Sequence, residues 1–512
     1  MPSRRRVAKN KPRQLDVNSL AVRSLPSEIL IRIFSDSICC CWGQPCFKPL
    51  RPGVSPLMLA AVCKQWRKLV LGCQTLWTHI DLIFDVLDPS GRYHDPNPWV
   101  EHSEGAPLNL HVLQFHTNTY SFQQDEDKES DALLFGGRYK RTPAPMVQRL
   151  FRFLSPLMPQ IRSAAMSVRW PYEAVLTEFL DLWAGTAECV KLLQVQSDSR
   201  SVNLAIHGSA QNTKFFESLE VLRLHNTELS WSKFDLNNLI ELDIQITSQR
   251  GWSMTQPELA AALASCPRLR RLAFDCLAVK PVPGQKPDPA VLEHLRILRV
   301  GAHEHIPAFN EPLMIGAILG VIDSRQSDLS LDISLRHLES PKQALDSLVS
   351  FIHRSNVTTL RVHGYDELGG NERPCFASQL SPLPNVQTLI LKHWYFRDVV
   401  RLVGGIYFSD EPRVFHNPRP TDPELVIWPS LKNLRLERCI LDKDYMRQLL
   451  SHHAVQTLHM RNCFDGRKTR DFKNMFDVGS TASKDYVQLL SQIIPTVVHF
   501  RTGWDHWESI FD

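Results

Sequence analysis

A six-residue pattern, apolar-x-x-apolar-x-apolar, recurs through the C-terminal part of this 512-residue chain. In a β-strand, neighbouring side chains point to opposite faces, so the apolar positions can line a core while the residues between them face outward. Seven of the ten steps between the fourth positions of successive copies span 24 to 33 residues, which is typical of stacked repeats. The copies are VKLLQV (190–195), LEVLRL (219–224), LIELDI (239–244), LRRLAF (269–274), LRILRV (295–300), the imperfect DLSLDI (328–333), VTTLRV (357–362), VQTLIL (386–391), LKNLRL (431–436), VQTLHM (455–460) and the degenerate PTVVHF (495–500).

Helical patterns fall between several of these copies. The clearest begins at Ser340-Pro341, where a capping residue precedes a proline suited to the first helical turn. Strand and helix in alternation predict a mixed α/β fold with a parallel sheet that is covered by helices on one side. The helical segments are QPELAAALASC (256–266), SPKQALDSLVSFIHRS (340–355), DKDYMRQLLSHH (442–453) and SKDYVQLLSQII (483–494).

This arrangement resembles a leucine-rich-repeat solenoid, and Cys439 and Cys463 fall on the Asn/Cys position of that repeat. The resemblance implies an irregular array over residues 147–512, with the parallel sheet on the concave side and the helices outside. Because the steps are unequal, an ordinary α/β domain with leucine-rich parallel strands is the alternative.

Composition excludes several classes of protein. The net charge of +4 is small for this length, so a chain-wide basic field for nucleic acid is not expected. The longest uncharged apolar run, LMIGAILGVI (313–322), is about half of the ~20 residues that span a bilayer. We therefore expect no membrane span and no membrane partner. Twelve cysteines scattered along so long a chain favour reduced thiols and a cytoplasmic or nuclear protein.

Three short amphipathic segments stand near the N-terminus, and the third holds Leu76, Trp77, Ile80 and Leu82. The first starts at Pro26, and its apolar residues recur at spacings of three and four. In the second, Ser55 is a plausible N-cap, Pro56 suits the first position, and Gly72 can end the helix in a left-handed conformation. Apolar stripes on so small a unit leave little core of their own, so they need a partner surface, which is either the rest of this chain or another protein.

These N-terminal residues resemble the F-box motif, and the chain as a whole resembles F-box proteins of the fungal type with C-terminal leucine-rich repeats. The matching positions are Leu25-Pro26, Glu28, Ile29-Leu30, Ile33-Phe34, Val62-Cys63, Trp66-Arg67 and Leu76-Trp77. The resemblance implies a trihelical unit over residues 23–82 that binds the Skp adaptor of Skp/cullin/F-box ubiquitin ligases. It assigns that contact to Leu25, Pro26, Ile29, Leu30, Ile33, Phe34, Leu59, Val62, Cys63 and Trp66.

The segments around this unit are expected to be irregular. Residues 1–22 form a basic tail, which is either a nuclear import signal over residues 4–13 or a plain solvated tail. An inserted loop at 39–54 holds Cys39, Cys40, Cys41 and Cys46, but no second ligand pair follows to complete a zinc site, so a loop is preferred. Residues 83–146 are predicted to be a linker with an acidic run at 123–131 and one possible strand, LNLHVL (108–113).

No catalytic motif is recognisable. The sequence has no P-loop, G-x-S-x-G elbow, HExxH or G-x-G-x-x-G, and the histidines at 303–305 and 452–453 lack a metal-ligand pattern. We therefore expect a non-catalytic subunit without cofactor or metal. An enzyme with an unrecognised site would show a deep pocket rather than an open face.

The residues between the apolar positions of each copy predict the concave face. Its central column reads Arg223, Asp243, Ala273, Arg299, Asp332, Arg361, Ile390, Arg435, His459 and His499. Clustered arginines bind carboxylates and phosphates, so an acidic or phosphorylated protein substrate is one hypothesis, and pairing of these arginines with Glu437 and its neighbours is the other. The predicted substrate-binding residues are Arg299, Arg361, Lys392, Arg435, His459, Arg461, His499 and Arg501.

Together these features indicate the substrate-recognition subunit of a Skp/cullin/F-box ubiquitin ligase, which reaches a cullin through the Skp adaptor and binds no nucleic acid. The alternative is a repeat scaffold that works without a ligase.

Overall fold

The structure, a computed structural model, divides into two compact units, Met1–Gln124 and Asp125–Asp512. The basic tail, the Cys-rich loop, the acidic run and Arg501 lie outside the described residues. Those described are 25–38, 55–85, 97–115, 152–168, 189–197, 202–204, 210–229, 231, 235–246, 253–285, 287–301, 315–325, 328–334, 341–363, 383–392, 429–441, 446, 450, 453–461, 463–465, 490–492 and 494–500.

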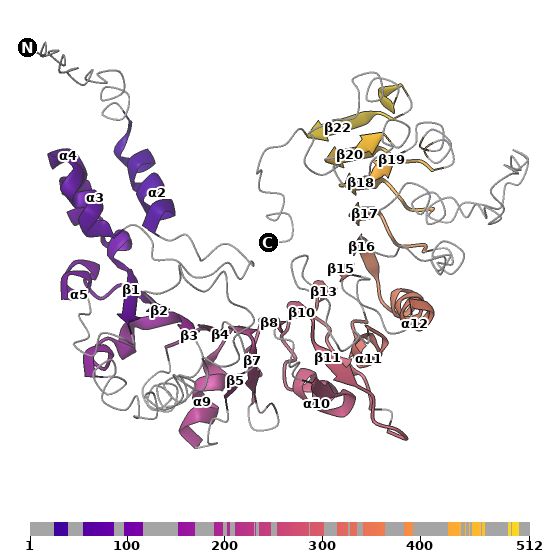
Figure 1. Ribbon diagram of the computed structural model, residues 1–512, viewed down its shortest axis with the longest axis horizontal. Coiled ribbons are helices and arrows are strands. Elements are labelled where there is room, and N and C mark those ends of the chain that lie inside the picture. The colour runs from indigo at the N-terminus through magenta and orange to yellow at the C-terminus, as the bar shows by residue number, and fades with distance from the viewer. Residues whose placement is uncertain are drawn as a thin grey trace, which may run out of the picture. The chain divides into compact units, whose positions relative to one another are not determined.

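The first unit begins with helices α2 (Ser27–Ile38), α3 (Pro56–Val62) and α4 (Lys64–Leu71), followed by the short 3-10 helix η1 (Gln74–Trp77) (Figure 1). Ser55 caps α3 as predicted, because its side chain accepts a hydrogen bond from the backbone N–H of Leu57 at 3.3 Å. The expectation of one continuous helix from 56 to 71 is wrong, since the backbone of Cys63 is extended and separates α3 from α4.

The break at Cys63 satisfies backbone groups that a helix end leaves without partners. Its Sγ accepts a hydrogen bond from the N–H of Trp66 at 3.4 Å, and Arg67 Nε donates to the carbonyl of Ala60 at 3.1 Å. Gly72 follows α4 as expected, but its φ of −87° is not the predicted left-handed conformation.

The core of the first unit lies where the inner faces of these helices meet. Leu30, Phe34 and Ile38 of α2 are buried, and the rings of Phe34 and Trp66 lie 4.6 Å apart. Trp77 is fully buried, and its Nε1 donates to the carbonyl of Val70 at 2.8 Å, which satisfies its one polar group.

The first unit continues beyond the helices. Strand β1 (His79–Asp85) pairs in parallel with β2 (Leu108–Phe115), and α5 (Asn97–Ser103) lies between them in sequence. Trp99 of α5 packs edge-on against Trp77, with ring centroids 5.9 Å apart. The expected strand at LNLHVL is therefore confirmed, whereas helix α5 was not predicted within the segment 83–146.

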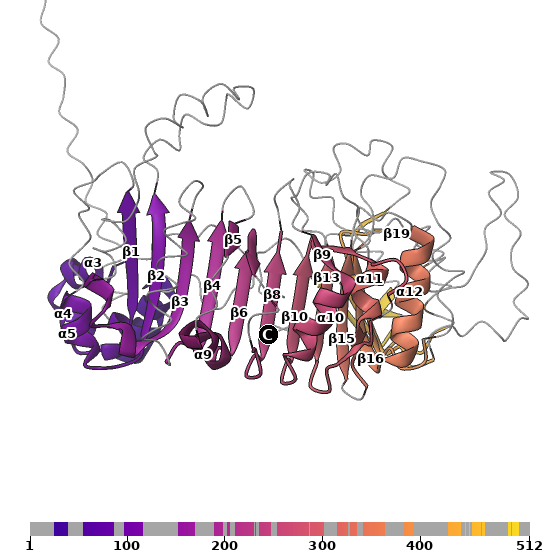
Figure 2. The same ribbon diagram turned by 90° about the horizontal axis from the view of Figure 1, so that it is seen from below.

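The second unit is built on one parallel sheet, whose strands stand side by side in Figure 2. In the order of their pairing they are β3 (Ile161–Val168), β4 (Leu192–Ser197), β6 (Val221–His225), β8 (Glu241–Gln245), β10 (Arg271–Asp275), β13 (Ile297–Gly301), β15 (Leu329–Ser334), β16 (Val357–His363), β17 (Thr388–Lys392), β18 (Asn433–Glu437), β20 (Thr457–Arg461) and β22 (Thr496–Phe500). The solenoid-like sheet that the repeats predict is thus present.

The copies before the last one form strands because their apolar positions are buried on one face. In β16, Leu360 and Val362 are buried, while Thr359 before them and Arg361 between them are partly exposed. Two features differ from the prediction. Strand β3 precedes the first predicted copy, and the last copy is shifted by one residue, so that His459 pairs with Val498 and Met460 with His499. The placement of His499 in the central column is therefore wrong.

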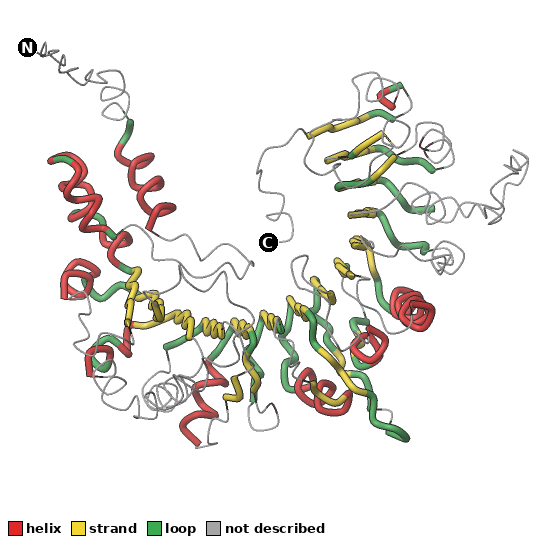
Figure 3. The backbone as a smooth tube through the Cα atoms, in the orientation of Figure 1, coloured by secondary structure: helices red, strands yellow, loops and turns green. Residues whose placement is uncertain are grey.

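Helices cover the face of the second unit's sheet opposite to the predicted concave face (Figures 1 and 3). Of the four predicted helical segments, those at 256–266 and 340–355 are confirmed, and Thr255 and Glu258 form a capping box at the first. Most residues of the segments predicted at 442–453 and 483–494 lie outside the described residues. No helix within the described ranges is both long and apolar enough to span a membrane. The helices are α9 (Ala210–Ser218), α10 (Gln256–Ala264), α11 (Ile315–Gly320) and α12 (Pro341–Arg354).

Short strands after the main ones, together with side-chain hydrogen bonds, link successive repeats. Asn226 Nδ2 donates to the carbonyl of Ser197 at 2.9 Å, and the thiols of Cys439 and Cys463 donate to the carbonyls of Leu391 and Leu436 at 3.4 and 3.2 Å. The two cysteines at the predicted consensus position therefore join one repeat to the preceding one. The short parallel pairs are β5 (Val202–Leu204) with β7 (Thr227–Leu229), β9 (Ser253–Thr255) with β11 (Ala278–Lys280), β12 (Ala290–Val291) with β14 (Ile322–Asp323) and β19 (Ile440–Leu441) with β21 (Phe464–Asp465).

Candidate functional site

The helices of the first unit expose an unusual amount of apolar surface. On α2, Ile29 and Ile33 are 47% and 45% exposed, and at a spacing of four residues they share one face of the helix. On α3, Met58 and Val62 have the same spacing and are 65% and 60% exposed. We call the exposed set the apolar surface: Ile29, Ile33, Leu57, Met58, Val62 and Leu71.

The structure divides the ten predicted adaptor-contact residues into three groups. Pro26, Ile29, Ile33 and Val62 are exposed, and Leu25, Cys63 and Trp66 are partly exposed. The other three are buried in the unit, so they maintain its fold and are not available for direct contact: Leu30, Phe34 and Leu59.

Three exposed apolar residues were not predicted: Leu57, Met58 and Leu71. The i, i+4 spacing of Met58 and Val62 was a usable signal for a second apolar face on α3. The prediction of a single helix between Pro56 and Gly72 obscured that face, because it joined the apolar residues of α3 and α4 into one pattern.

The register of the second unit's sheet defines the concave column. In the strand register Arg299 lies opposite Asp332, and Asp332 lies opposite Arg361. The column continues through Ile390, Arg435 and His459. The column is not uniformly accessible, since Ile390 is 1% exposed. A flanking column, two residues further along each strand, holds His363, Lys392, Glu437 and Arg461.

Asp332 is the acidic centre of this region. Its carboxylate lies 3.0 Å from His363 Nε2 and 3.6 Å from Arg361 Nη1. Burial alone would raise the pKa of Asp332, but His363, Arg361 and Arg299 hold it well below its ordinary value. Burial lowers the pKa of His363 against the opposing effect of this carboxylate.

Beyond Asp332 the concave column becomes cationic. Burial and then the charge of Arg361 lower the pKa of Arg435, while Glu437 opposes them. Burial and the charge of Arg435 lower the pKa of His459 in the same way. Neighbouring positive groups therefore destabilise one another at this end of the sheet.

In the N-terminal part of the column, positive and negative charges balance each other instead. Arg223 Nε lies 2.8 Å from Glu241 Oε1, and both side chains are largely buried. Burial raises the pKa of Asp243 to about 7, although Arg299 and Arg223 oppose this effect. Because the pairs on β6 and β8 neutralise each other, this part of the face lacks the excess of positive charge found on β16 to β20.

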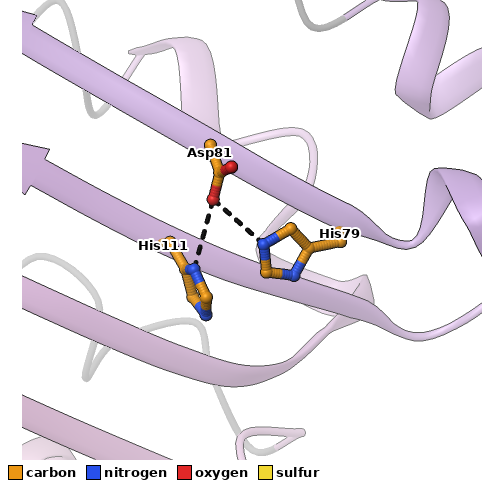
Figure 4. A group of neighbouring side chains, drawn as sticks. All are labelled: His79, Asp81 and His111. Carbon is orange, nitrogen blue, oxygen red and sulfur yellow. Dashed lines mark hydrogen bonds and ion pairs between the residues drawn. The ribbon is translucent and has the colours of Figure 1, made fainter. Parts of the chain in front are cut away.

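A third group lies within the first unit, where His79, Asp81 and His111 meet (Figure 4). Asp81 Oδ1 lies 3.0 Å from His79 Nε2 and 3.2 Å from His111 Nδ1. Burial alone would raise the pKa of Asp81, but His111 and His79 hold it well below its ordinary value. Sequence reasoning missed this group, because it predicted no metal-binding residue and placed His111 in a linker.

Comparison with known proteins gives one family match. Residues 22–83 match the model of the family described as F-box-like, which agrees with the predicted limits of 23–82. A comparison with curated proteins finds no match.

Among solved structures, the chain is similar to "Plant peptide hormone receptor RGFR1 in complex with RGF2", with 14% identity over 60% of this chain. This chain spans 46% of that receptor chain, and the TM-score of 0.22 is too low to support any conclusion about function. The chain therefore carries an N-terminal F-box-like domain at residues 22–83, ahead of a long parallel sheet.

Proposed function

We propose that this protein is the substrate-recognition subunit of a Skp/cullin/F-box ubiquitin ligase. The F-box-like unit would bind the Skp adaptor and, through it, a cullin. The sheet of the second unit, interpreted as leucine-rich repeats, would hold a protein substrate. Tethering raises the effective concentration of substrate lysines near a ubiquitin-charged enzyme, so no residue of this chain has to form a covalent bond.

The observation that carries this proposal is the apolar surface within the segment that matches the F-box-like family. Exposed apolar residues that share one helix face are typical of protein interaction sites. Ile29 and Ile33 on α2, and Met58 and Val62 on α3, form such faces, while Leu30 and Phe34 are buried and hold α2 in the unit.

Co-purification tests the adaptor contact. Full-length protein should recover the Skp adaptor, and an Ile29→Ser/Ile33→Ser double variant should lose it. Burying each isoleucine is worth about 1.5–3 kcal/mol, so the expected loss of affinity is about 100-fold or more. Val291 is an exposed apolar residue of the second unit, which makes Val291→Ser the matched control.

Equal recovery of the adaptor by the double variant and by Val291→Ser would contradict the proposed contact. Failure of every form, including the unchanged chain, to bind the adaptor would favour an interaction scaffold without a ligase.

For the substrate, we propose a segment that carries carboxylates or phosphates. Arg361 and Arg435 follow one another in the central column, separated only by Ile390, and His459 lies beyond them. Arg461 adds positive charge in the flanking column. Burial lowers the pKa of Arg435 most, and the charge of Arg361 lowers it further, so a second positive group nearby is unfavourable. A bound anion would relieve that repulsion and accept charge-assisted hydrogen bonds.

Pairing within the chain competes with this role. Arg361 already lies 3.6 Å from Asp332, and Glu437 stands between Lys392 and Arg461 in the flanking column. Among the described residues of β15 to β20, Asp332 and Glu437 are outnumbered in these two columns by Arg361, Lys392, Arg435 and Arg461, so this part of the face carries a net positive charge. Arg435 and Arg461 are therefore the residues on which the proposal depends most.

A phosphopeptide library, titrated beside its unphosphorylated counterpart, tests the substrate class. The full-length chain should prefer the phosphorylated peptides at low salt, and an Arg435→Glu/Arg461→Glu variant should lose that preference. Arg296 is exposed and lies just before β13, so Arg296→Glu serves as the control for a general change in charge. No preference in the unchanged chain, or equal losses in both variants, would contradict the assignment.

A further inference from the structure

The pairing of β1 with β2 brings three metal-binding side-chain types together in the first unit. Asp81 and His111 are directly opposite each other on the two parallel strands. His79 stands two residues before Asp81, and at that spacing both side chains lie on the same face of the sheet. Figure 4 shows both imidazoles turned toward the carboxylate of Asp81.

The distances match what a small cation would need. The three ligand atoms, His79 Nε2, Asp81 Oδ1 and His111 Nδ1, all lie within 4.8 Å of one another. Around a tetrahedral zinc ion with bonds of about 2.0–2.2 Å, ligand atoms are separated by about 3.3 Å. Two of the three separations, 3.0 and 3.2 Å, are close to that value already.

The site is held rigidly. His79 and His111 are buried, and their rings are packed edge to face with centroids 4.2 Å apart. Both strands are fixed by their mutual backbone pairing, and η1 before β1 contains the fully buried Trp77. Ligands that need little movement favour metal binding, because little conformational entropy is lost when the ion enters.

Another His–Asp pair in the chain shows what is special here. Asp332 and His363 lie 3.0 Å apart, but the carboxylate also lies 3.6 Å from Arg361, whose charge repels a cation. The carboxylate of Asp81, in contrast, lies beside two imidazoles, those of His79 and His111, and both can bind a metal ion. Among the described residues, His79, Asp81 and His111 are the one group of three such side chains that converge.

We propose that His79, Asp81 and His111 bind a divalent transition-metal ion, with Zn²⁺ the first candidate. Two imidazole nitrogens and one carboxylate oxygen suit zinc and its neighbours better than Ca²⁺ or Mg²⁺, which prefer oxygen ligands. Three protein ligands leave a coordination position for water. The ion would join β1 to β2 immediately after the F-box-like helices, and so stabilise the first unit.

The test uses the full-length chain without a polyhistidine tag, stripped of metal with a chelator. Cys39, Cys40, Cys41 and Cys46 could bind zinc independently, so all measurements use a background in which these four are serine. Co²⁺ is then titrated by visible absorption, and zinc is counted by mass spectrometry after equilibration and dialysis.

One ion per chain is expected in this background. His111→Asn and Asp81→Asn should each weaken Co²⁺ binding by more than about tenfold, since even outer-shell changes cost 10–100-fold. His363→Asn, which alters the other His–Asp pair, should bind like the background. Zinc should also raise the melting temperature of the background and of His363→Asn, but not that of Asp81→Asn.

The proposal is overturned if the background chain retains no ion, or if Asp81→Asn and His111→Asn bind as the background does. Should asparagine at 111 prevent folding, Asp81→Asn and the zinc-dependent melting temperature of the background decide the question by themselves.

Discussion

Two aspartates in the same column of the sheet respond to burial in opposite ways. Arg223, a basic residue near Asp243, already forms an ion pair with Glu241. Burial raises the pKa of Asp243 to about 7. Asp332 contacts both Arg361 and His363, and its pKa stays well below the ordinary value. The sequence predicted that both face the concave side, but their charge states depend on which neighbours are already paired.

Asp243 should make the second unit less stable as the pH rises. Its folded-state pKa of about 7 exceeds the ordinary value of 3.8, so the folded state holds a proton that the unfolded state loses. The free energy of unfolding therefore falls between about pH 4 and pH 7. Asp243→Asn should remove this contribution, and denaturant unfolding at a series of pH values would show its gain over the unchanged chain growing across that window. A constant difference would contradict the argument.

Asp332 should behave in the opposite way. Its folded-state pKa is lowered, so its contribution to stability is complete above 3.8 and is lost as the pH falls through the folded-state value. Asp332→Asn should cost about 3 kcal/mol at pH 7, because it leaves the largely buried Arg361 and His363 without their carboxylate. The same unfolding series should show the two proteins converging below pH 3.8. A gap that persists there would indicate a packing defect instead.

At the scale of elements, part of the apolar stripe of helix α2 packs into the core of the first unit and part of it is exposed. The sequence predicted one stripe of Ile29, Leu30, Ile33 and Phe34, and all four have the period that a helix face requires. Periodicity identifies a broad apolar face but not which part of it lies inward. In the structure Leu30 and Phe34 pack into the unit, and Ile29 and Ile33 face outward.

Adjacent residues on α2 should therefore give opposite phenotypes. Phe34→Ala should destabilise the first unit by about 3–5 kcal/mol, because it removes a buried ring that packs against Trp66. Ile33→Ser should change the free energy of unfolding by less than about 0.5 kcal/mol and yet weaken adaptor binding. Thermal unfolding and an adaptor titration on both variants check this division. Loss of stability in Ile33→Ser would mean that its side chain belongs to the core.

The break at Cys63 shows why some elements could not be predicted. The apolar period continues from α3 into α4, so the pattern alone favours one helix, and only the capping contact of Cys63 with Trp66 reveals the interruption. Strand β3 was missed for a related reason: its inward positions, Ala164 and Met166, are less distinctive than the leucines of other copies. The leucine-rich copies themselves were predicted correctly, because burial on one face requires their alternation.

At the scale of the whole molecule, the proposed adaptor binding belongs to the first unit and the proposed substrate binding to the second. The F-box-like limits and the parallel sheet could be predicted, because both depend on many ordered apolar positions. The His79–Asp81–His111 group could not, since it depends on the register of strands joined across residues that had been expected to form a linker.

Two separate binding surfaces predict that variants of one surface leave binding at the other unchanged in the full-length protein. Arg435→Glu/Arg461→Glu should leave adaptor affinity within about twofold, because changes at separate sites without shared partners are usually additive. Ile29→Ser/Ile33→Ser should likewise leave phosphopeptide binding unchanged. Parallel titrations of both ligands on both variants measure this, and a loss of both activities in either variant would contradict two separate surfaces.

Calorimetric titration of the Skp adaptor into the full-length chain at several temperatures tests the central claim most directly. Burial of the apolar surface predicts saturable one-to-one binding with a negative heat-capacity change, and a smaller change for residual binding by Ile33→Ser. The account would be contradicted by the absence of binding, or by binding whose heat-capacity change is near zero and the same in both proteins.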